Sequence, residues 1–253
     1  VTSIGNNAFS GCSSLTDITI PSSVTGIGDF ALSECTGLTS INISEGVTSI
    51  GNGAFSDCSS LTDITIPSSV TSIGMSAFND CDSLTSITIP ESVTSIGAFA
   101  FQDCTGLTSI TIPKSVTSIG NNVFYGCTAL KEVLLEGGST LTSENFGEVA
   151  NKVVTRWNED NLTWTLSADG TTMTISGTGA MKAYDTDDSP ATQKKDNVNK
   201  VVIENGITSI GAYAFYDCSS LTSIEIPEGV TSIGNNAFSG CSSLTDITIP
   251  SSV

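Results

Sequence analysis

The apolar residues of this chain return at the same positions every 23 residues. In the first copy, Val1–Val24, they are Val1, Ile4, Ala8, Phe9, Cys12, Leu15, Ile18 and Ile20. This copy recurs letter for letter at Val230–Val253, and variants of it fill most of the chain between. A fixed period in the twenties predicts a solenoid, in which each repeat buries its apolar side by stacking on its neighbours.

Each repeat predicts three short elements. Leu15–Ile20 alternates between apolar and polar residues and contains β-branched side chains, which is typical of a strand. Pro21 ends that strand, because proline has no N–H to donate to a neighbouring strand. Val1–Gly5 predicts a second short extended segment, and Asn6–Cys12 predicts one helical or 3-10 turn. Strands of successive repeats are expected to pair in parallel, about 4.7–4.9 Å apart.

Written over one period, L-x-x-I-x-I-P-x-x-V-x-x-I-G-x-x-A-F-x-x-C resembles the BspA-type, or treponemal-type, leucine-rich repeat. The resemblance covers Val1–Leu135 and Val198–Val253. It implies a right-handed leucine-rich-repeat solenoid with parallel β strands and short helical or 3-10 turns. It also implies a bacterial cell-surface or secreted protein, similar to adhesins, whose partners are surface proteins or glycans of a host or of other microbes. No cofactor is implied.

The repeats break off in the middle of the chain, where the composition shifts. We therefore expect three parts: a repeat array over residues 1–135, a β-containing insert over 136–197, and a second repeat array over 198–253. The insert holds both tryptophans, the only arginine and most of the basic residues. It caps the two arrays or joins them, and we favour joining, with Trp164 buried against a solenoid end.

Three pieces are expected within the insert. Ser143–Lys152 carries apolar residues at helical spacing behind a candidate N-cap, Ser143, and predicts a degenerate closing repeat. Two alternating segments, Trp164–Leu166 and Met173–Ile175, flank Ala-Asp-Gly and predict a β-hairpin. Tyr184–Asn197 is polar and contains proline, and it predicts an exposed loop.

The charge balance narrows the classes of partner. The chain has 26 acidic residues against 8 basic residues and no histidine. Nucleic-acid phosphates and anionic lipids both require basic contacts, so neither is an expected partner. No transmembrane run or signal peptide is visible. The sequence starts and stops in mid-pattern, so we expect a piece of a longer protein. The apolar repeat edges at Val1 and Val253 predict end-to-end self-association.

The polar positions of the Leu15–Ile20 strand and its copies form columns on what should be the outer face of one sheet. Such a face is the expected partner surface of a leucine-rich-repeat solenoid, and it suits an extended partner. Here the side chains of the face are small and polar, and the face lacks the aromatic and arginine anchors of tight interfaces. A purely structural spacer is therefore the alternative to a binding module. The candidate binding residues are Thr16, Asp17, Thr19, Thr39, Asn42, Thr62, Asp63, Thr65, Thr85, Thr88, Thr108 and Thr111.

Two further columns carry reactive residue types. The eight cysteines, one per repeat, predict a buried thiol ladder, because zinc needs four converging ligands and stacked cysteines point in parallel. Acidic residues precede the cysteine in four consecutive repeats, and they are either solvated carboxylates or a weak calcium site. The cysteines are Cys12, Cys35, Cys58, Cys81, Cys104, Cys127, Cys218 and Cys241, and the acidic residues are Glu34, Asp57, Asp80 and Asp103.

Enzymatic function is not expected. Without histidine, neither a Ser-His-Asp nor a Cys-His arrangement can form. The phosphate-binding pattern G-x-x-x-x-G-K-[ST] does not occur. The acidic residues over 185–188 lie in the predicted loop rather than in a pocket that could hold paired catalytic carboxylates. The sequence thus favours a surface that binds or spaces over one that catalyses.

Overall fold

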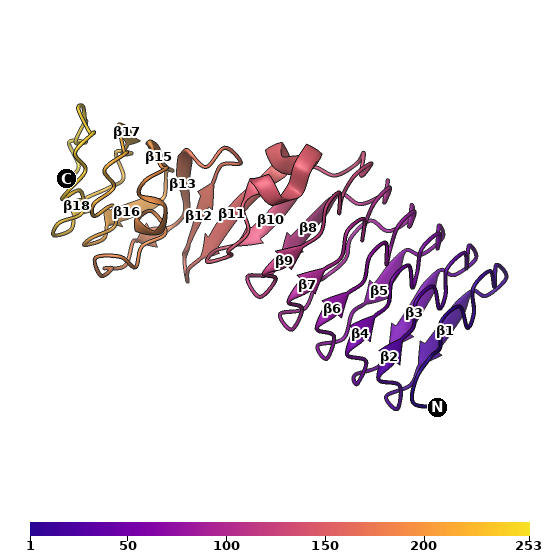
Figure 1. The fold of residues 1–253 in the computed structure, drawn as a ribbon. Helices are drawn as coiled ribbons and strands as arrows, with labels where there is room; N and C mark the ends of the chain where they lie inside the picture. The colour runs from indigo at the N-terminus through magenta and orange to yellow at the C-terminus, as the bar shows by residue number, and fades with distance from the viewer. The chain divides into compact units, whose positions relative to one another are not determined.

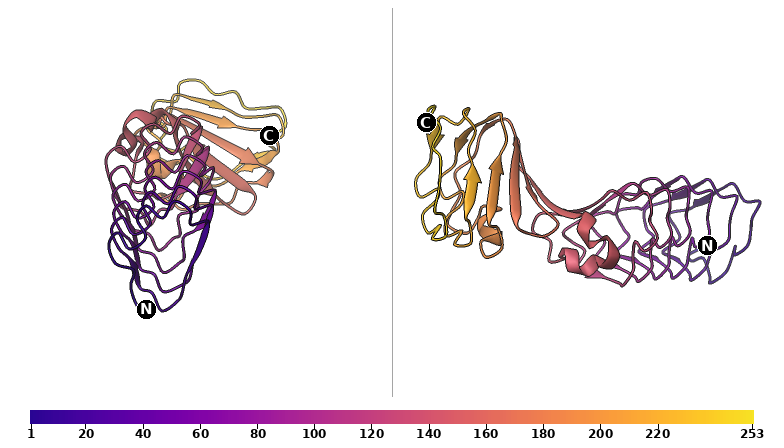
Figure 2. Two further views of the ribbon diagram at one scale, coloured as in Figure 1. Left: turned by 90° about the vertical axis from the view of Figure 1, so that its right-hand side faces the viewer. Right: turned by 90° about the horizontal axis from the view of Figure 1, so that it is seen from above.

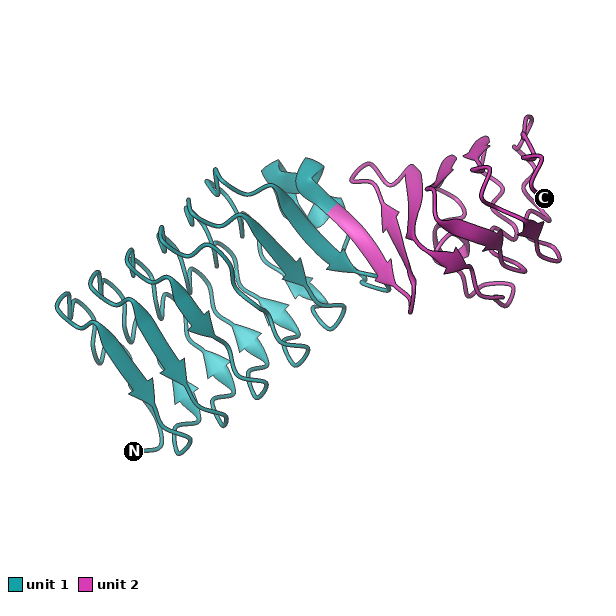
Figure 3. Ribbon diagram, turned by 180° about the vertical axis from the view of Figure 1, so that it is seen from behind, with its two compact units in different colours: residues 1–153 teal, residues 154–253 magenta.

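The computed structural model describes all 253 residues, which divide into two compact units, Val1–Val153 and Val154–Val253 (Figure 3). Unit 1 is a stack of successive coils of the chain, and unit 2 consists of antiparallel strands followed by further coils (Figures 1 and 2). The predicted division by repeat type, at residues 135 and 197, is of a different kind and stays a prediction. None of the helices has the length and apolar composition needed to cross a lipid bilayer.

The first side of the unit 1 coils is the main sheet, built from the predicted Leu-x-x-Ile-x-Ile strands. Its strands run in parallel, with Ile18 opposite Ile41 and Ile41 opposite Ile64. The isoleucines therefore share the inner face. In the fourth repeat the strand is reduced to a single bridge between Thr88 and Thr111, which separates two groups of strands. The strands are β1 (Asp17–Ile20), β3 (Ser40–Ile43), β5 (Asp63–Thr65), β8 (Ser109–Ile112) and β10 (Glu132–Glu136).

The second side is a continuous ladder of five two-residue strands, which the predicted second extended segment provides. All five pair in parallel. Such short strands have too few hydrogen bonds to be stable alone, so the stacking of the repeats must hold them. They are β2 (Gly26–Ile27), β4 (Ser49–Ile50), β6 (Ser72–Ile73), β7 (Ser95–Ile96) and β9 (Ser118–Ile119).

The third side is a ladder of turns. In Asn6–Cys12, alternate N–H groups close i→i−3 turns, which is the bond of a 3-10 helix. The N–H groups between them, such as that of Phe9, instead donate to carbonyls of the next repeat, here Ala31 at 2.7 Å. The segment is therefore a chain of overlapping turns rather than a helix. This arrangement gives buried backbone groups a partner in every repeat.

A stack of phenylalanine rings fills the centre of unit 1. Phe78 lies between Phe55 and Phe101, with ring centroids 5.3 Å apart on each side. The stack continues through Phe124 to Phe146, at 5.7 Å and 6.2 Å. Phe146 lies in the 3-10 helix η1 (Ser143–Lys152). The predicted degenerate closing repeat therefore does extend the core.

The start of η1 differs by one residue from the prediction. Thr142, not Ser143, is the N-cap residue. Its backbone N–H donates to the Oδ1 atom of Asn145 at 2.8 Å. Thr142 and Ser143 both carry hydroxyl side chains that favour the N-cap position, and helix boundaries vary by a residue, so the sequence alone could not decide between them.

Unit 2 begins with antiparallel strands and continues with parallel ones. The predicted hairpin is confirmed: β12 pairs with β13 and places Trp164 opposite Ile175. β11 lies on the other side of β12, and β13 is followed by parallel strands of the repeat type. A second, shorter sheet forms beside them. The strands are β11 (Val153–Asn158), β12 (Leu162–Leu166), β13 (Thr172–Gly177), β15 (Lys200–Ile203) and β17 (Ser223–Glu225), with β14 (Gly179–Ala180), β16 (Ile207–Ile210) and β18 (Ser232–Ile233) in the shorter sheet.

Trp164 is fully buried, as predicted, and it starts the aromatic core of unit 2. Its ring packs on Phe215 at 5.7 Å and meets Tyr184 edge-on at 5.9 Å. Phe215 in turn stacks on Phe238 at 5.3 Å. The aromatic core therefore continues from the hairpin into the repeats of the same unit.

The prediction that Tyr184–Asn197 is an exposed loop is wrong for half of its length. Tyr184, Ser189, Ala191 and Thr192 are buried, and a short 3-10 helix, η2 (Thr192–Lys194), follows. The Ser189 hydroxyl donates to the carbonyl of Ala214 at 2.6 Å. Internal hydrogen bonds satisfy the polar side chains and so permit their burial, which composition cannot reveal.

Candidate functional site

The candidate binding residues lie on the outer face of the main sheet in unit 1. All twelve are exposed. Those within the strands, such as Thr19 and Asn42, alternate with inward-facing isoleucines, whereas Thr16 and its copies lie directly before the strands. The register aligns them in columns, since Asp17 faces Ser40, Thr19 faces Asn42, and Asn42 faces Thr65. The structure thus brings these residues onto one surface. Whether that surface binds a partner stays a prediction.

Part of this threonine surface has a structural role. The hydroxyls of Thr39, Thr62 and Thr108 each donate to the backbone carbonyl of the threonine one repeat earlier, at 3.1–3.3 Å. The second sheet shows the same pattern, for example from Thr48 to Thr25 at 3.1 Å. These side chains stabilise the stack whether or not a partner binds. The hydroxyls of Thr19, Thr65 and Thr111 make no such bond and are free to contact a partner.

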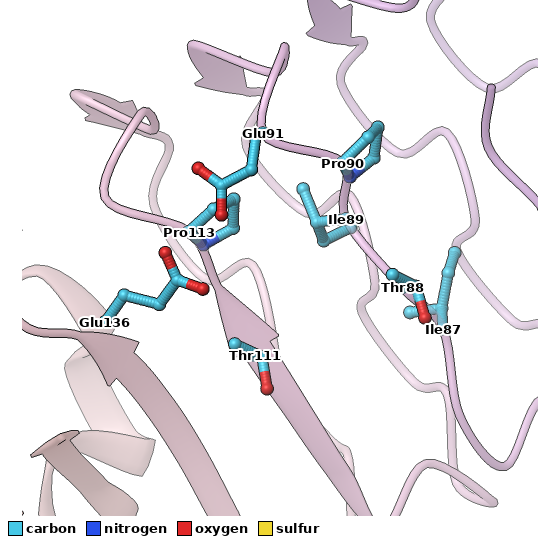
Figure 4. Close-up of a pocket in the computed structure, with 8 residues that line it drawn as sticks. All are labelled: Ile87, Thr88, Ile89, Pro90, Glu91, Thr111, Pro113 and Glu136. Carbon is cyan, nitrogen blue, oxygen red and sulfur yellow. The ribbon is translucent and has the colours of Figure 1, made fainter. Parts of the chain in front are cut away.

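A groove of about 400 Å³ lies at one end of this face (Figure 4). Two candidate residues, Thr88 and Thr111, line it. Glu91 and Glu136 stand at its rim with their carboxylates turned toward each other beside Pro113. The full lining is Ile87, Thr88, Ile89, Pro90, Glu91, Thr111, Pro113 and Glu136.

The two carboxyl groups of this groove affect each other's ionisation. Partial burial, followed by the hydrogen bond and the negative charge of Glu136, raises the pKa of Glu91, and the nearby charge of Lys114 opposes this shift. The backbone N–H of Lys114 donates to the Oε2 atom of Glu136 at 3.2 Å. Sequence reasoning missed both glutamates. The signal was present, because Glu136 stands where most earlier repeats have proline, as at Pro90 and Pro113.

The acidic column is explained by backbone conformation. Glu34, Asp57, Asp80 and Asp103 all have positive φ, between 54° and 60°. Asp217 in unit 2 has the same conformation, and in the remaining repeats glycine occupies this left-handed position, as at Gly126. Asp is among the few residues other than glycine that adopt this conformation readily, and a turn therefore selects it.

The hypothesis of a calcium site in this column is not supported. No three His, Cys, Asp or Glu side chains of the chain are grouped so that they could hold a metal ion. Calcium needs six to eight oxygen ligands, which a single column of carboxylates at repeat spacing cannot converge to supply. Partial burial and the like charges of Asp57, Asp103 and Asp82 raise the pKa of Asp80. The column is a set of turn residues that repel one another.

The cysteine column forms a ladder of free thiols. Six of the eight cysteines are buried, while Cys12 is exposed and Cys241 is partly exposed. Each buried thiol from Cys35 to Cys127 donates to the carbonyl of the residue in the Phe column one repeat earlier, at 3.0–3.2 Å. Burial raises the pKa of Cys58 to about 12 and that of Cys127 to about 11. Such thiols stay protonated and unreactive at neutral pH.

Six copies of the BspA type leucine rich repeat region match the sequence, over residues 1–105, 55–152 and 189–253. The chain belongs to the BspA-type leucine-rich repeat family. The resemblance drawn from the repeat pattern is therefore confirmed, as is the solenoid of parallel strands. The matches to BspA-type repeats include residues 136–152 and 189–197 of the predicted insert.

Solved structures of bacterial leucine-rich repeat proteins resemble this BspA-type chain. A protein from Bacteroides ovatus is 29% identical with a TM-score of 0.51, over 99% of this chain and 70% of that one. A leucine rich cell surface protein from Faecalibacterium prausnitzii is 29% identical with a TM-score of 0.43, over 100% and 78%. The pneumococcal vaccine antigen PcpA is 23% identical with a TM-score of 0.49, over 100% and 68%. No curated protein matches.

Proposed function

We propose that this chain is a binding module of a cell-surface or secreted bacterial protein, which presents the main-sheet face of unit 1 to a surface protein or glycan. Membership of the BspA-type family supports a repeat module that binds proteins. The observation that carries the proposal is the alignment of twelve exposed polar side chains in columns on one face. The proposal includes an adhesin-like role, which the same family membership supports.

The chemistry of the face predicts weak contacts that add up. Small hydroxyl and amide groups contribute little each, and the face lacks the large anchors of tight interfaces. Repetition compensates, because several equal contacts along one partner raise the overall affinity by avidity. An extended partner that runs across successive strands would use the columns best.

A structural spacer is the second candidate function. The hydroxyls of Thr39, Thr62 and Thr108 are already used within the stack, so their recurrence needs no partner. In this reading the chain holds another domain away from the cell surface. The two functions differ in whether the isolated chain binds anything at all.

The test is a pair of lysine substitutions on the main-sheet face, Thr19→Lys with Thr65→Lys. We expect the purified chain to bind host or bacterial cell surfaces, or matrix proteins coated on a plate, and the double variant to bind at least about tenfold more weakly. Long, charged side chains would block the shallow columns. The matched control is Thr36→Lys with Thr128→Lys, two exposed turn positions that add the same charge. It should bind as the unsubstituted chain does.

The outcomes separate the candidates. If the double variant and the control lose binding equally, the loss is caused by the added positive charge and not by blocking of the main-sheet face. Absence of binding by the unsubstituted chain to every surface would overturn the binding module and support the spacer.

A further inference from the structure

Two glutamates in the same column of unit 1 have opposite surroundings. Glu45 and Glu91 stand at the same position, two repeats apart. The carboxylate of Glu45 accepts hydrogen bonds from the N–H and the hydroxyl of Ser68 and from the N–H of Ser69, each at 3.1 Å. The Ser68 N–H is the largest of the causes that lower the pKa of Glu45. Glu45 therefore caps the turn of the next repeat.

Glu91 cannot make the equivalent cap. The matching N–H group belongs to Lys114, and it donates to Glu136 from the following repeat instead. Glu91 is left facing the carboxyl group of Glu136. Ser115, which follows Lys114, also lacks the hydrogen bond that its column makes in earlier repeats. Ser69 and Ser92 donate to valine carbonyls at 2.7 Å and 2.6 Å, whereas the buried hydroxyl of Ser115 has no partner.

The groove next to this pair has room for a side chain. Its volume is about 400 Å³, and Ile87, Ile89 and the two prolines give it apolar walls. The ion pairs of the structure involve neither Glu91 nor Glu136. Two carboxylates are too few to hold calcium, and neutral hydroxyl groups would not offset two adjacent negative charges.

We propose that this groove receives an arginine side chain of a protein partner, with the guanidinium bridging Glu91 and Glu136. The fork of a guanidinium donates to two carboxylates at once, which a single ammonium does less well. The aliphatic stem of arginine packs on apolar walls such as those of the two prolines. The inference rests on the proposed function for its protein partner. It adds that the partner is basic where it crosses this end of the main-sheet face.

The test uses the full chain and a blocked tripeptide, acetyl-Gly-Arg-Gly-amide. The carboxyl carbons of Glu91 and Glu136 are followed by NMR while the peptide is added. We expect both signals to shift saturably and the Glu91 pKa to fall when the peptide is bound, because a nearby cation stabilises the carboxylate. Peptides with lysine or with neutral citrulline in place of arginine, and a neutral disaccharide, are the comparison ligands.

Single substitutions test whether the two glutamates bind the arginine peptide. Glu91→Gln and Glu136→Gln should each weaken arginine-peptide binding by at least about tenfold. Glu45→Gln removes the same charge from the same column and should leave binding unchanged. Equal binding of the citrulline peptide, stronger binding of the disaccharide, or unchanged binding by Glu91→Gln would each overturn the proposal. Because the peptide probe needs no natural partner, its failure is separable from loss of surface binding in the lysine variants.

Discussion

The core of unit 1 is a stack of phenylalanines that occupy the same position in successive repeats. The core of unit 2 begins instead with Trp164 and Tyr184, which are not part of a repeated column. In unit 1 each ring repeats the contact of its neighbour, and five buried thiols follow the same order. In unit 2, Trp164 and Tyr184 both donate to the Oε2 atom of Glu159, at 3.1 Å and 2.6 Å. Lys182 pairs with the other oxygen of Glu159 at 3.1 Å.

The difference teaches that one fold can be stabilised by many equal contacts or by one shared acceptor. In a stack, the loss of one contact leaves identical contacts above and below, because each repeat interacts only with its neighbours. In the Glu159 network, one carboxylate satisfies three donors, so its loss affects them together. The two units should therefore respond differently to pH and to substitution.

The largest expected effect is a loss of unit 1 stability at alkaline pH. Burial raises the pKa of Cys58 from 9.0 to about 12, and that of Cys127 to about 11. The unfolded chain therefore loses these protons first, and folding stability falls as pH rises from 9 towards 12. For Cys58 the loss is about 1.4 kcal/mol per pH unit in this window, and for Cys127 it ends near pH 11. The pKa values of the other buried thiols are also raised by burial, so their loss of stability has the same sign. Unit 1 has five buried thiols and unit 2 has one, Cys218, whose pKa is also raised to about 12.

The measurement is urea unfolding at about pH 8 and at about pH 10.5, in reducing buffer. Both tryptophans, Trp157 and Trp164, lie in unit 2, so fluorescence reports that unit while circular dichroism reports both. Unit 1 should lose more stability than unit 2. Equal losses would show that the thiol ladder does not distinguish the units.

The next largest effect is expected from Phe78→Ala. Its ring is fully buried between two others, so its removal leaves a cavity that costs roughly 3–5 kcal/mol. Denaturant unfolding followed by circular dichroism measures the loss, and the fluorescence transition of unit 2 should not move. The control is Tyr125→Ala, whose ring is 49% exposed and should change stability by about 0.5 kcal/mol at most. An unfolding curve for Phe78→Ala that superimposes on that of the control would contradict the stacked core.

A smaller effect is expected from Glu159→Gln in unit 2. The amide keeps the shape but removes the charge that accepts from Trp164 and Tyr184, so stability should fall by about 1.5–3 kcal/mol. Tryptophan fluorescence during urea unfolding reports this unit directly. Glu204→Gln, at an exposed position of the same unit, is the matched control. If both variants unfold at the same urea concentration, the shared acceptor has no special role.

Much of the fold could be predicted from the period alone. Inside the arrays the columns of Ile, Val, Phe and Cys are buried, because successive repeats place the same residue in the same register. The sequence could not show that Tyr184–Asn197 is partly buried, because the Ser189 hydroxyl finds its acceptor, the carbonyl of Ala214, only in the folded chain. It also could not show why acidic residues precede cysteine, since their positive φ is a property of the turn ladder.

The sequence by itself determined that this protein is a stack of repeats, which residues form its core, and which polar residues share an outer face. The period suffices for that, because identical repeats must make identical contacts. Only the tertiary structure decided which members of one column differ. Glu45 and Glu91 are the same residue at the same position, yet one caps a turn and the other faces Glu136 across a groove. The physical reason is that a side chain in a solenoid takes its surroundings from the neighbouring repeats, which are distant in sequence.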